Sequence, residues 1–219
     1  MNKSSVETHF DKVAAGYDSG KKKYDYYYEN LKKLLKSLIP VGKKVFEVGC
    51  GTGDLLVSLK PAEGLGQDIS KEMVRIAKFK HSKNKNIKFS TKWPNKTFDY
   101  IFMSDVIEHL ENPKAVFSKI SKLMNSRSIF INTMANPLWE PMLIFWELVG
   151  WKMKEGKHKR IRYSEIEKIL NSVGLKIVKH DYKLLVSIKI PVVTEFINKY
   201  LEKYFKKIAF IEYIVVVKS

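Results

Sequence analysis

The stretch from residues 43 to 56 constrains the fold of this chain more than any other part of its sequence. It reads KKVFEVGCGTGDLL, and the apolar run Val45–Val48 predicts a buried strand that leads through a glycine turn into a helix. Gly49, Gly51 and Gly53 alternate in that turn. Glycine permits a positive φ and lets a ligand lie against the backbone, while the N-terminus of the following helix offers free N–H groups. The pattern therefore predicts an α/β fold with a ligand site at the end of this strand.

Two acidic positions in this stretch argue against a dinucleotide site. Dinucleotide-binding turns carry the pattern G-x-G-x-x-G, whereas here Asp54 stands in the place of the last glycine. Glu47 puts a carboxylate beside the turn, near the end of the strand. A carboxylate suits an ammonium group or hydroxyls and repels a pyrophosphate. A nucleotide-dependent oxidoreductase is therefore a disfavoured alternative.

The pattern E-x-G-x-G-x-G resembles the first motif of class I S-adenosylmethionine (AdoMet)-dependent methyltransferases, and the resemblance extends over nearly the whole chain. Asp68 follows about twenty residues after the turn, at the end of a second predicted strand (residues 64–67), where an acidic residue meets ribose hydroxyls. The resemblance implies AdoMet as the cofactor and S-adenosylhomocysteine as its product. The residues expected to bind the cofactor are Tyr17, Glu47, Gly49, Cys50, Gly51, Gly53, Asp68, Ile69, Thr91 and Ser104.

One departure from the family concerns the adenine contact. In the family an acidic residue often follows the third strand, predicted here over residues 87–90, and meets the adenine amino group. This chain continues with Thr91, Lys92 and Trp93 instead. We expect Thr91 or backbone groups to replace the acid, with Trp93 packed nearby.

The N-terminal segment carries a second part of the resemblance. Many small-molecule methyltransferases open with F-D-x-x-A-x-x-Y-D, a segment that folds over the cofactor. This chain matches it with Phe10, Asp11, Ala14, Tyr17 and Asp18. The alternative is an ordinary helix that docks on the sheet through an aromatic face.

Asp105, Glu108 and His109 are the expected catalytic residues. They follow a predicted strand (residues 98–103) in a segment that resembles the F-D-x-I-x-x-x-x-V-x-E-H region of many methyltransferases, the quinone-biosynthesis O-methyltransferases included. Their spacing predicts a shared face on a helical turn. His109 could act as a general base that Glu108 orients, the trio could hold a divalent ion, or all three could build and cap the loop. No metal site is expected.

The segment from residue 136 to residue 162 predicts a lid-like insertion. It contains Trp139, Trp146 and Trp151, and a basic stretch follows them. Such a segment could cover an apolar substrate or lie at a membrane interface. The alternative is a helix packed over the strand ends.

The resemblance implies a single domain over residues 1–219 with residues 1–40 as a helical cover. Its fold is expected to be a Rossmann-like, doubly wound sheet of seven mostly parallel strands with helices on both faces. The tail from residue 175 to residue 217 predicts strand, helix and strand, and the last strand is expected to enter antiparallel between its neighbours.

Composition limits the partners. The formal charge is +17, but only four of the 40 basic residues are arginine, the residue that base reading and bidentate phosphate contacts favour. Cys50 is the single cysteine, so no internal disulfide is expected, and the sequence shows neither a signal peptide nor a run long enough to span a bilayer. A cytoplasmic protein is therefore expected, without dedicated nucleic-acid binding.

The sequence thus predicts a methyltransferase that acts on a small, partly apolar or lipid-linked acceptor by O- or N-methylation. Peripheral contact with an anionic membrane agrees with the charge. A non-catalytic AdoMet- or RNA-binding module is the alternative from another class. The sequence gives no indication of the oligomeric state.

Overall fold

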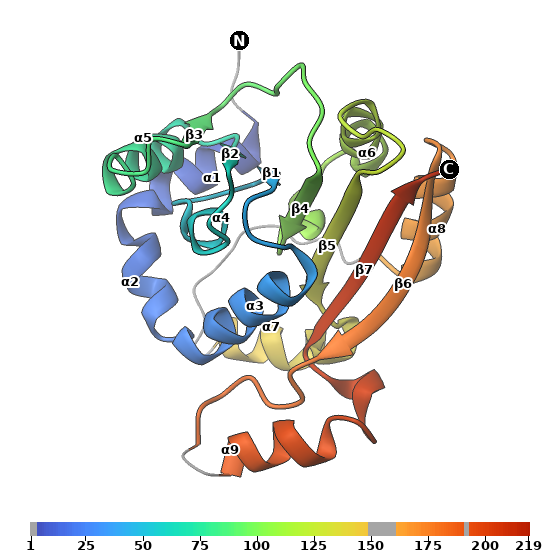
Figure 1. Ribbon diagram of the computed structural model, residues 1–219. Helices are drawn as coiled ribbons and strands as arrows, with labels where there is room; N and C mark the ends of the chain where they lie inside the picture. The colour runs from blue at the N-terminus through green and yellow to red at the C-terminus, as the bar shows by residue number, and fades with distance from the viewer. Residues whose placement is uncertain (1–3, 149–160, 191–192) are drawn as a thin grey trace.

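A seven-stranded sheet forms the centre of the chain in the computed structural model, which describes residues 4–148, 161–190 and 193–219 (Figure 1). The strand order is β3-β2-β1-β4-β5-β7-β6. All neighbouring strands pair parallel except β7, which runs antiparallel to both β5 and β6. The strands are β1 Lys44–Val48, β2 Glu63–Gln67, β3 Ile87–Ser90, β4 Tyr100–Ser104, β5 Ile129–Ala135, β6 Leu175–Lys183 and β7 Ile211–Lys218. The predicted fold class, with its antiparallel last strand, is confirmed.

Helices cover both faces of the sheet because side chains alternate along each strand. Val45 packs in a core with α3 and α4, whereas its neighbour Phe46 packs in the opposite core with α6 and α8. Ile131 and Phe130 divide between the two cores in the same way. The helices are α1 Ser5–Val13, α2 Tyr17–Lys22, α3 Asp25–Leu38, α4 Asp54–Ser58, α5 Lys71–Lys80, α6 Pro113–Lys122, α7 Glu140–Leu148, α8 Tyr163–Asn171 and α9 Val193–Phe196.

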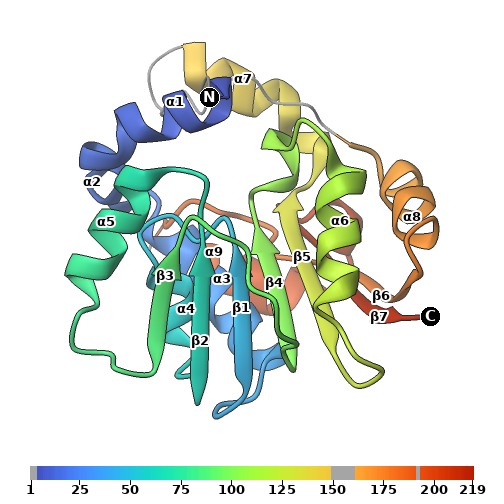
Figure 2. The same cartoon turned by 90° about the horizontal axis from the view of Figure 1, so that it is seen from above.

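The chain order reverses between β1 and β4, which are neighbours in the sheet. Their carboxyl ends mark the place where open α/β sheets bind ligands. Figure 2 shows α1 and α7 lying across this end of the sheet. Helix α1 and the helix that follows β5 therefore lie over the region where the glycine turn begins.

The end of the chain departs from the predicted strand and helix. The strand expected over residues 175–186 ends at Lys183, because Leu184 has a φ of 66° and donates its N–H to the buried carboxylate of Glu202 at 2.7 Å. The helix expected over residues 192–205 consists of α9 and a π-helical turn, Ile197–Leu201. The wider turn lets the N–H of Glu202 reach the carbonyl of Ile197 at 3.2 Å.

No helix in the described part of the chain combines the length and hydrophobicity that a bilayer crossing requires. The expected lid falls partly outside the described residues, because residues 149–160, with Trp151, are not among them.

Candidate active site

The glycine turn after β1 has the conformation that the sequence predicts. Gly49 and Gly51 have φ values of 71° and 50°. The N–H groups of Gly49 and Cys50 both donate to the carbonyl of Gln67, at 2.7 and 2.9 Å, and tie the turn to the end of β2. A Cβ on Gly49 would lie 2.4 Å from a methyl carbon of Val106. Only glycine fits this position, and the backbone of the turn stays accessible to a ligand.

Asp68 braces the same turn from the end of β2. Its Oδ2 accepts the N–H of Gly51 at 2.8 Å, and its Oδ1 accepts the N–H of Ser70 at 2.9 Å. Burial raises the pKa of Asp68, and these two hydrogen bonds act in the opposite direction. Ser70 precedes α5 as its N-cap and accepts the N–H of Met73 at 3.1 Å, so Asp68 is left for the turn and its ligand.

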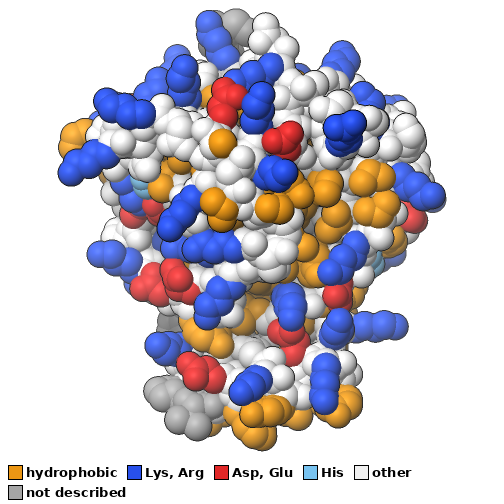
Figure 3. Space-filling view, in the orientation of Figure 1, with side chains coloured by type: hydrophobic (Ala, Val, Ile, Leu, Met, Phe, Trp, Pro, Cys, Tyr) orange, Lys and Arg blue, Asp and Glu red, His pale blue; other side chains and the backbone are white. Residues whose placement is uncertain are grey.

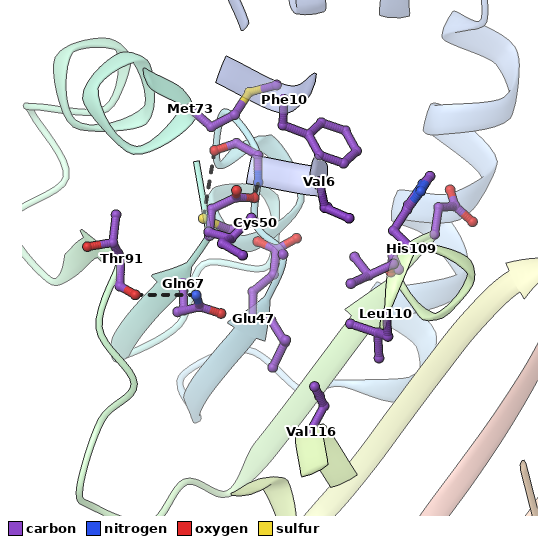
Figure 4. A pocket seen from close by; sticks show the side chains of 18 of the residues that line it. Val6, Phe10, Glu47, Cys50, Gln67, Met73, Thr91, His109, Leu110 and Val116 are labelled. Carbon is purple, nitrogen blue, oxygen red and sulfur yellow. Dashed lines mark hydrogen bonds between the residues drawn. The ribbon is translucent and has the colours of Figure 1, made fainter. Parts of the chain in front are cut away.

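A cavity of about 440 Å³ lies against the glycine turn (Figure 4). Ser104 offers it a hydroxyl that is buried and has no hydrogen-bond partner within the described residues. Gly53 does not line the cavity: its φ is 87°, and a Cβ there would strike the ring of Phe89. The predicted cofactor-binding residues that line the cavity are Tyr17, Glu47, Gly49, Cys50, Gly51, Asp68, Ile69, Thr91 and Ser104.

An acidic and a basic side chain, Glu47 and Lys21, line the same cavity. Burial raises the pKa of Glu47 well above its ordinary value, and the nearby charge of Lys21 and the N–H of Leu56 oppose that effect. Burial also lowers the pKa of Lys21, whose ammonium lies 4.6 Å from the ring centres of both Tyr17 and Tyr28. An amino-acid zwitterion fits such a pair, with its ammonium toward Glu47 and its carboxylate toward Lys21.

Lys21 is a lining residue that the motif analysis missed. It stands four residues after Tyr17 in α2, and positions i and i+4 share a helix face. That spacing is the signal by which the sequence could have indicated it.

Residues 91–93, which follow β3 and carry no acidic side chain, contribute to the cavity. Thr91 and Trp93 both line the cavity, and the side-chain amide of Gln67 donates to the carbonyl of Thr91 at 3.5 Å. Gln67 and Met73 also line this cavity and were not singled out from the sequence.

The N-terminal motif closes one side of the cavity, and each part of it has a separate contact. The aromatic residues Phe10 and Tyr17 line the cavity. Asp11 accepts the hydroxyl of Ser70 at 2.6 Å and so fixes α1 to the start of α5. Asp18 accepts the hydroxyl of Thr52 at 2.6 Å and so fixes α2 to the glycine turn. The two aspartates fasten a cover whose aromatic side chains face the ligand space, and Figure 4 shows Phe10 beside that space.

Lys80 strengthens this attachment. Its ammonium lies 2.7 Å from a carboxylate oxygen of Asp18 and 2.8 Å from one of Asp54. Burial raises the pKa of Asp18, but the bonds from Lys80 and Thr52 outweigh it and hold that pKa below its ordinary value.

A second cavity, of about 500 Å³, adjoins the first. Aromatic side chains dominate its lining, from the cover, α3, α7 and the start of β7. From α7, Leu143 and Trp146 line it, whereas the indole of Trp139 donates to the carbonyl of Ile208 at 2.8 Å. The residues common to both cavities are Phe10, Tyr17, Tyr28, Asp105 and His109.

Asp105, Glu108 and His109 all line the second cavity, but not on one helical face. The expectation of a shared face is wrong, because only the short 3₁₀ turn Ile107–His109 forms and Asp105 precedes it with a φ of 53°. Asp105 accepts the hydroxyl of Tyr27 at 2.7 Å, and Glu108 is buried.

His109 lies edge-on to the ring of Phe10, with the ring centres 5.3 Å apart. The described residues contain no group of three or more His, Cys, Asp or Glu side chains arranged to hold a metal ion. The base, metal and structural alternatives for the trio stay predictions, and the described residues do not arrange the trio as a metal site in this structure.

Comparison with known proteins decides the family. Residues 21–180 match the methyltransferase domain family. The chain belongs to this family. The resemblance to class I AdoMet-dependent methyltransferases is confirmed by this match together with the fold.

The methyltransferase has relatives among both curated and solved proteins. An uncharacterized Methanocaldococcus jannaschii protein is 30% identical over 185 residues, which cover 82% of this chain and 71% of that protein. The ubiquinone biosynthesis O-methyltransferase of Proteus mirabilis is 26% identical over 153 residues, 62% of each chain. The magnesium protoporphyrin IX methyltransferase of Synechocystis, solved with bound SAH, superimposes with a TM-score of 0.71 at 17% identity, over 100% of both chains.

Proposed function

We propose that this methyltransferase moves the methyl group of AdoMet to a hydroxyl oxygen of a small, partly apolar acceptor. The observation that carries the proposal is the pair of adjoining cavities with Phe10, Tyr17, Tyr28, Asp105 and His109 in common. One cavity offers the groups that a charged nucleoside ligand needs, and the other offers an aromatic lining. The acceptor would meet the methyl donor where the two cavities join.

The lining of the first cavity fits AdoMet. Asp68 would accept hydrogen bonds from the ribose hydroxyls, and Glu47 and Lys21 would hold the ammonium and carboxylate of the methionine part. The buried hydroxyl of Ser104, which has no hydrogen-bond partner in the described part of the chain, and the open backbone of the turn are further groups that a ligand would satisfy. The Synechocystis relative, solved with the demethylated product, supports this cofactor.

AdoMet supplies a methyl group that its sulfonium already activates, so the protein mainly has to bind, orient and exclude water. Phe10 and Tyr17 provide the apolar cover of the junction, and their attachment through Asp11 and Asp18 keeps it closed. A hydroxyl acceptor must lose a proton. His109 lines both cavities, which supports it as the group that would accept this proton, since imidazole is the side chain best suited to proton transfer near neutral pH.

The second cavity indicates the acceptor class. Its aromatic lining favours a flat or partly apolar molecule, because stacking and burial would stabilise it there. The charged side chains of the lining are three lysines (Lys22, Lys23 and Lys189) and three acids (Asp25, Asp105 and Glu108), so the aromatic residues rather than a net charge favour the acceptor. The O-methyltransferase among the relatives supports oxygen as the accepting atom.

The test is a transfer assay with AdoMet labelled in its methyl group. The panel contains aromatic hydroxyl compounds with and without an anionic substituent, matched amines, and short duplex RNA. We expect label transfer to a hydroxyl compound, together with stoichiometric S-adenosylhomocysteine. Transfer only to amines would overturn the assignment of oxygen. AdoMet binding without transfer to any acceptor would favour the non-catalytic module.

A further inference from the structure

The segment between β6 and β7 forms a helical layer whose polar face is turned inward. Thr194, Asn198 and Glu202 follow one another at intervals of four residues. Thr194 and Glu202 are buried and Asn198 is half-buried. Helices on a protein surface ordinarily bury their apolar face and expose the polar one. Here the arrangement is reversed, and the reversal needs an explanation.

Each inward side chain binds the backbone of the segment that leads out of β6. Glu202 accepts the N–H of Leu184 at 2.7 Å, and Asn198 accepts the N–H of Val186 at 2.8 Å and donates to its carbonyl at 2.9 Å. Thr194 accepts the N–H of Ile190 at 2.9 Å and donates to the carbonyl of Ile188 at 2.8 Å. The layer is therefore fastened in this orientation by a series of specific hydrogen bonds.

The outward face carries aromatic side chains at the same interval. Phe196, Tyr200 and Tyr204 are 56%, 48% and 71% exposed. Figure 3 shows hydrophobic side chains gathered at the lower end of the molecule, over α9, with lysines beside them. Other large apolar side chains of this segment that are exposed are Ile188, Ile190, Val193, Phe205 and Ile208. A face of this kind is unusual on an isolated soluble protein and marks an interaction surface.

Lysines lie between the aromatic residues. Lys199 and Lys203 place their ammonium groups 5.1 and 4.7 Å from the ring centres of Tyr200 and Tyr204. Across residues 188–208 the sequence has five lysines against two glutamates, and one of those glutamates, Glu202, is buried against the protein. The exposed face is therefore both apolar and positively charged.

We infer that this face, defined here by Phe196, Lys199, Tyr200, Lys203 and Tyr204, docks on an anionic phospholipid surface. Lysine beside exposed aromatic residues suits the boundary between headgroups and acyl chains, because the rings enter the boundary and the ammonium groups stay at the phosphates. Protein interfaces are instead depleted of lysine at their centre. Nucleic-acid surfaces favour arginine, and residues 188–208 contain none.

The helical layer that carries the docking face is attached through its inward side to a segment that lines the second cavity. Ile188 and Lys189 line that cavity, and their segment is the one that Asn198 and Thr194 fasten. Asn198 also donates to the hydroxyl of Tyr26, another lining residue, at 3.1 Å. A protein docked in this way would hold the acceptor cavity close to the lipid surface. This route for the acceptor rests on the proposed function, whereas the docking face itself does not.

Vesicle flotation tests the inference. Vesicles of phosphatidylcholine with phosphatidylglycerol are compared with vesicles of phosphatidylcholine alone, at low and at high salt. We expect the full chain to float with the anionic vesicles, and less so at high salt. The variant Phe196→Ser/Tyr200→Ser/Tyr204→Ser should have a partition coefficient for these vesicles that is lower by about tenfold or more. It loses the apolar area that enters the boundary between headgroups and acyl chains. The matched control is Phe79→Ser on α5, which removes a ring that is 85% exposed and should float like the wild type.

A lysine variant and a binding measurement complete the test. Lys199→Gln/Lys203→Gln/Lys207→Gln should lose flotation, whereas Lys85→Gln/Lys88→Gln/Lys92→Gln, three exposed lysines near β3, should keep it. AdoMet affinity and the thermal midpoint of each variant show that the fold persists. Wild-type protein that stays unfloated, or an aromatic variant that floats like the wild type, would overturn the inference. The inference would also be overturned if the aromatic variant kept its flotation but lost binding to duplex RNA, or kept its flotation but lost self-association. A failed transfer assay leaves the flotation result untouched.

Discussion

The hydroxyl of Tyr27 donates a 2.7 Å hydrogen bond to the carboxylate of Asp105 and so joins α3 to the end of β4. Asp105 lines both cavities, and its backbone is held at a φ of 53°, which is costly for a residue with a side chain. The hydrogen bond therefore orients the carboxylate of Asp105, on a strained backbone, at the place where the proposed donor and acceptor meet.

Tyr27→Phe should destabilise the protein by about 1–3 kcal/mol, since the half-buried carboxylate of Asp105 loses a donor. Burial, and then the charge of Asp105, raises the pKa of Tyr27 well above its ordinary value. The hydroxyl therefore keeps its proton, and the loss of unfolding free energy in Tyr27→Phe should be the same at pH 6 and pH 9. Urea unfolding of both proteins measures it. Tyr204→Phe, at a 71% exposed position, is the matched control and should change little. Equal losses in the two variants would speak against a special role for the Tyr27 bond.

Glu47→Gln should stabilise the ligand-free protein and weaken AdoMet binding. Burial raises the pKa of Glu47, so the folded chain holds this proton more tightly than the unfolded chain. The resulting stability is complete below the unfolded pKa and is lost as the pH rises through the folded pKa. Glutamine removes that loss, so the variant should be the more stable protein above this range and equal to the wild type in acid. AdoMet affinity should fall by about tenfold or more, as one charged hydrogen bond is lost.

Unfolding curves at several pH values, together with calorimetry, check both parts. A variant that is less stable than the wild type at pH 8, or that binds AdoMet equally well, would contradict the role given to Glu47.

The attachment of the cover through Asp18 should control how long the cofactor stays bound. Asp18→Ala removes the contacts to Thr52 and Lys80, so AdoMet should dissociate faster by about tenfold while the association rate changes less. Because the pKa of Asp18 is held below its ordinary value, this attachment is present above the unfolded pKa and is lost as the pH falls. Stopped-flow displacement measures the rate. Glu29→Ala, which removes an exposed pair with Lys32 on α3, should leave it unchanged. Equal AdoMet dissociation rates in the wild type and in Asp18→Ala would contradict a role of the cover in holding the cofactor.

His109→Ala should leave AdoMet affinity within about threefold and slow turnover by about 10² or more, the usual contribution of a general base. His109→Gln keeps bulk beside Phe10 and should be similarly slow, which separates proton transfer from packing. A chelator should not change turnover of the wild type. His180→Gln, whose partner is Glu212, is the control histidine. Full activity in both His109 variants would leave only the structural alternative for this residue.

The sequence predicted the parts of the site that depend on local chemistry. Gly49, Gly51 and Asp68 lie as expected, because a strand end, a turn and a helix cap follow from a few neighbouring residues. The positive φ of Asp105 could not be predicted, since a contact 78 residues away, with Tyr27, holds it.

Gly53 and the last helix show the same limit. Gly53 matches the cofactor motif, yet it lies against Phe89 of β3 and does not line the cavity. The predicted helix after β6 becomes in part a π turn, where Glu202 has a partner in Leu184. In each case the tertiary partner decides the structure, and no local pattern encodes it.

The central claim, that the cavity at the glycine turn binds AdoMet through Asp68, is tested most directly by calorimetric titration of AdoMet into three proteins. The wild type should bind one equivalent. Asp68→Ala should lose about 1.5–3 kcal/mol of binding free energy, the value of a charged hydrogen bond. Gly51→Val should show no binding while still folded, because its side chain would enter beside Tyr17 at a backbone position with a φ of 50°. A wild-type protein without measurable AdoMet binding, or an Asp68→Ala variant of unchanged affinity, would contradict the account.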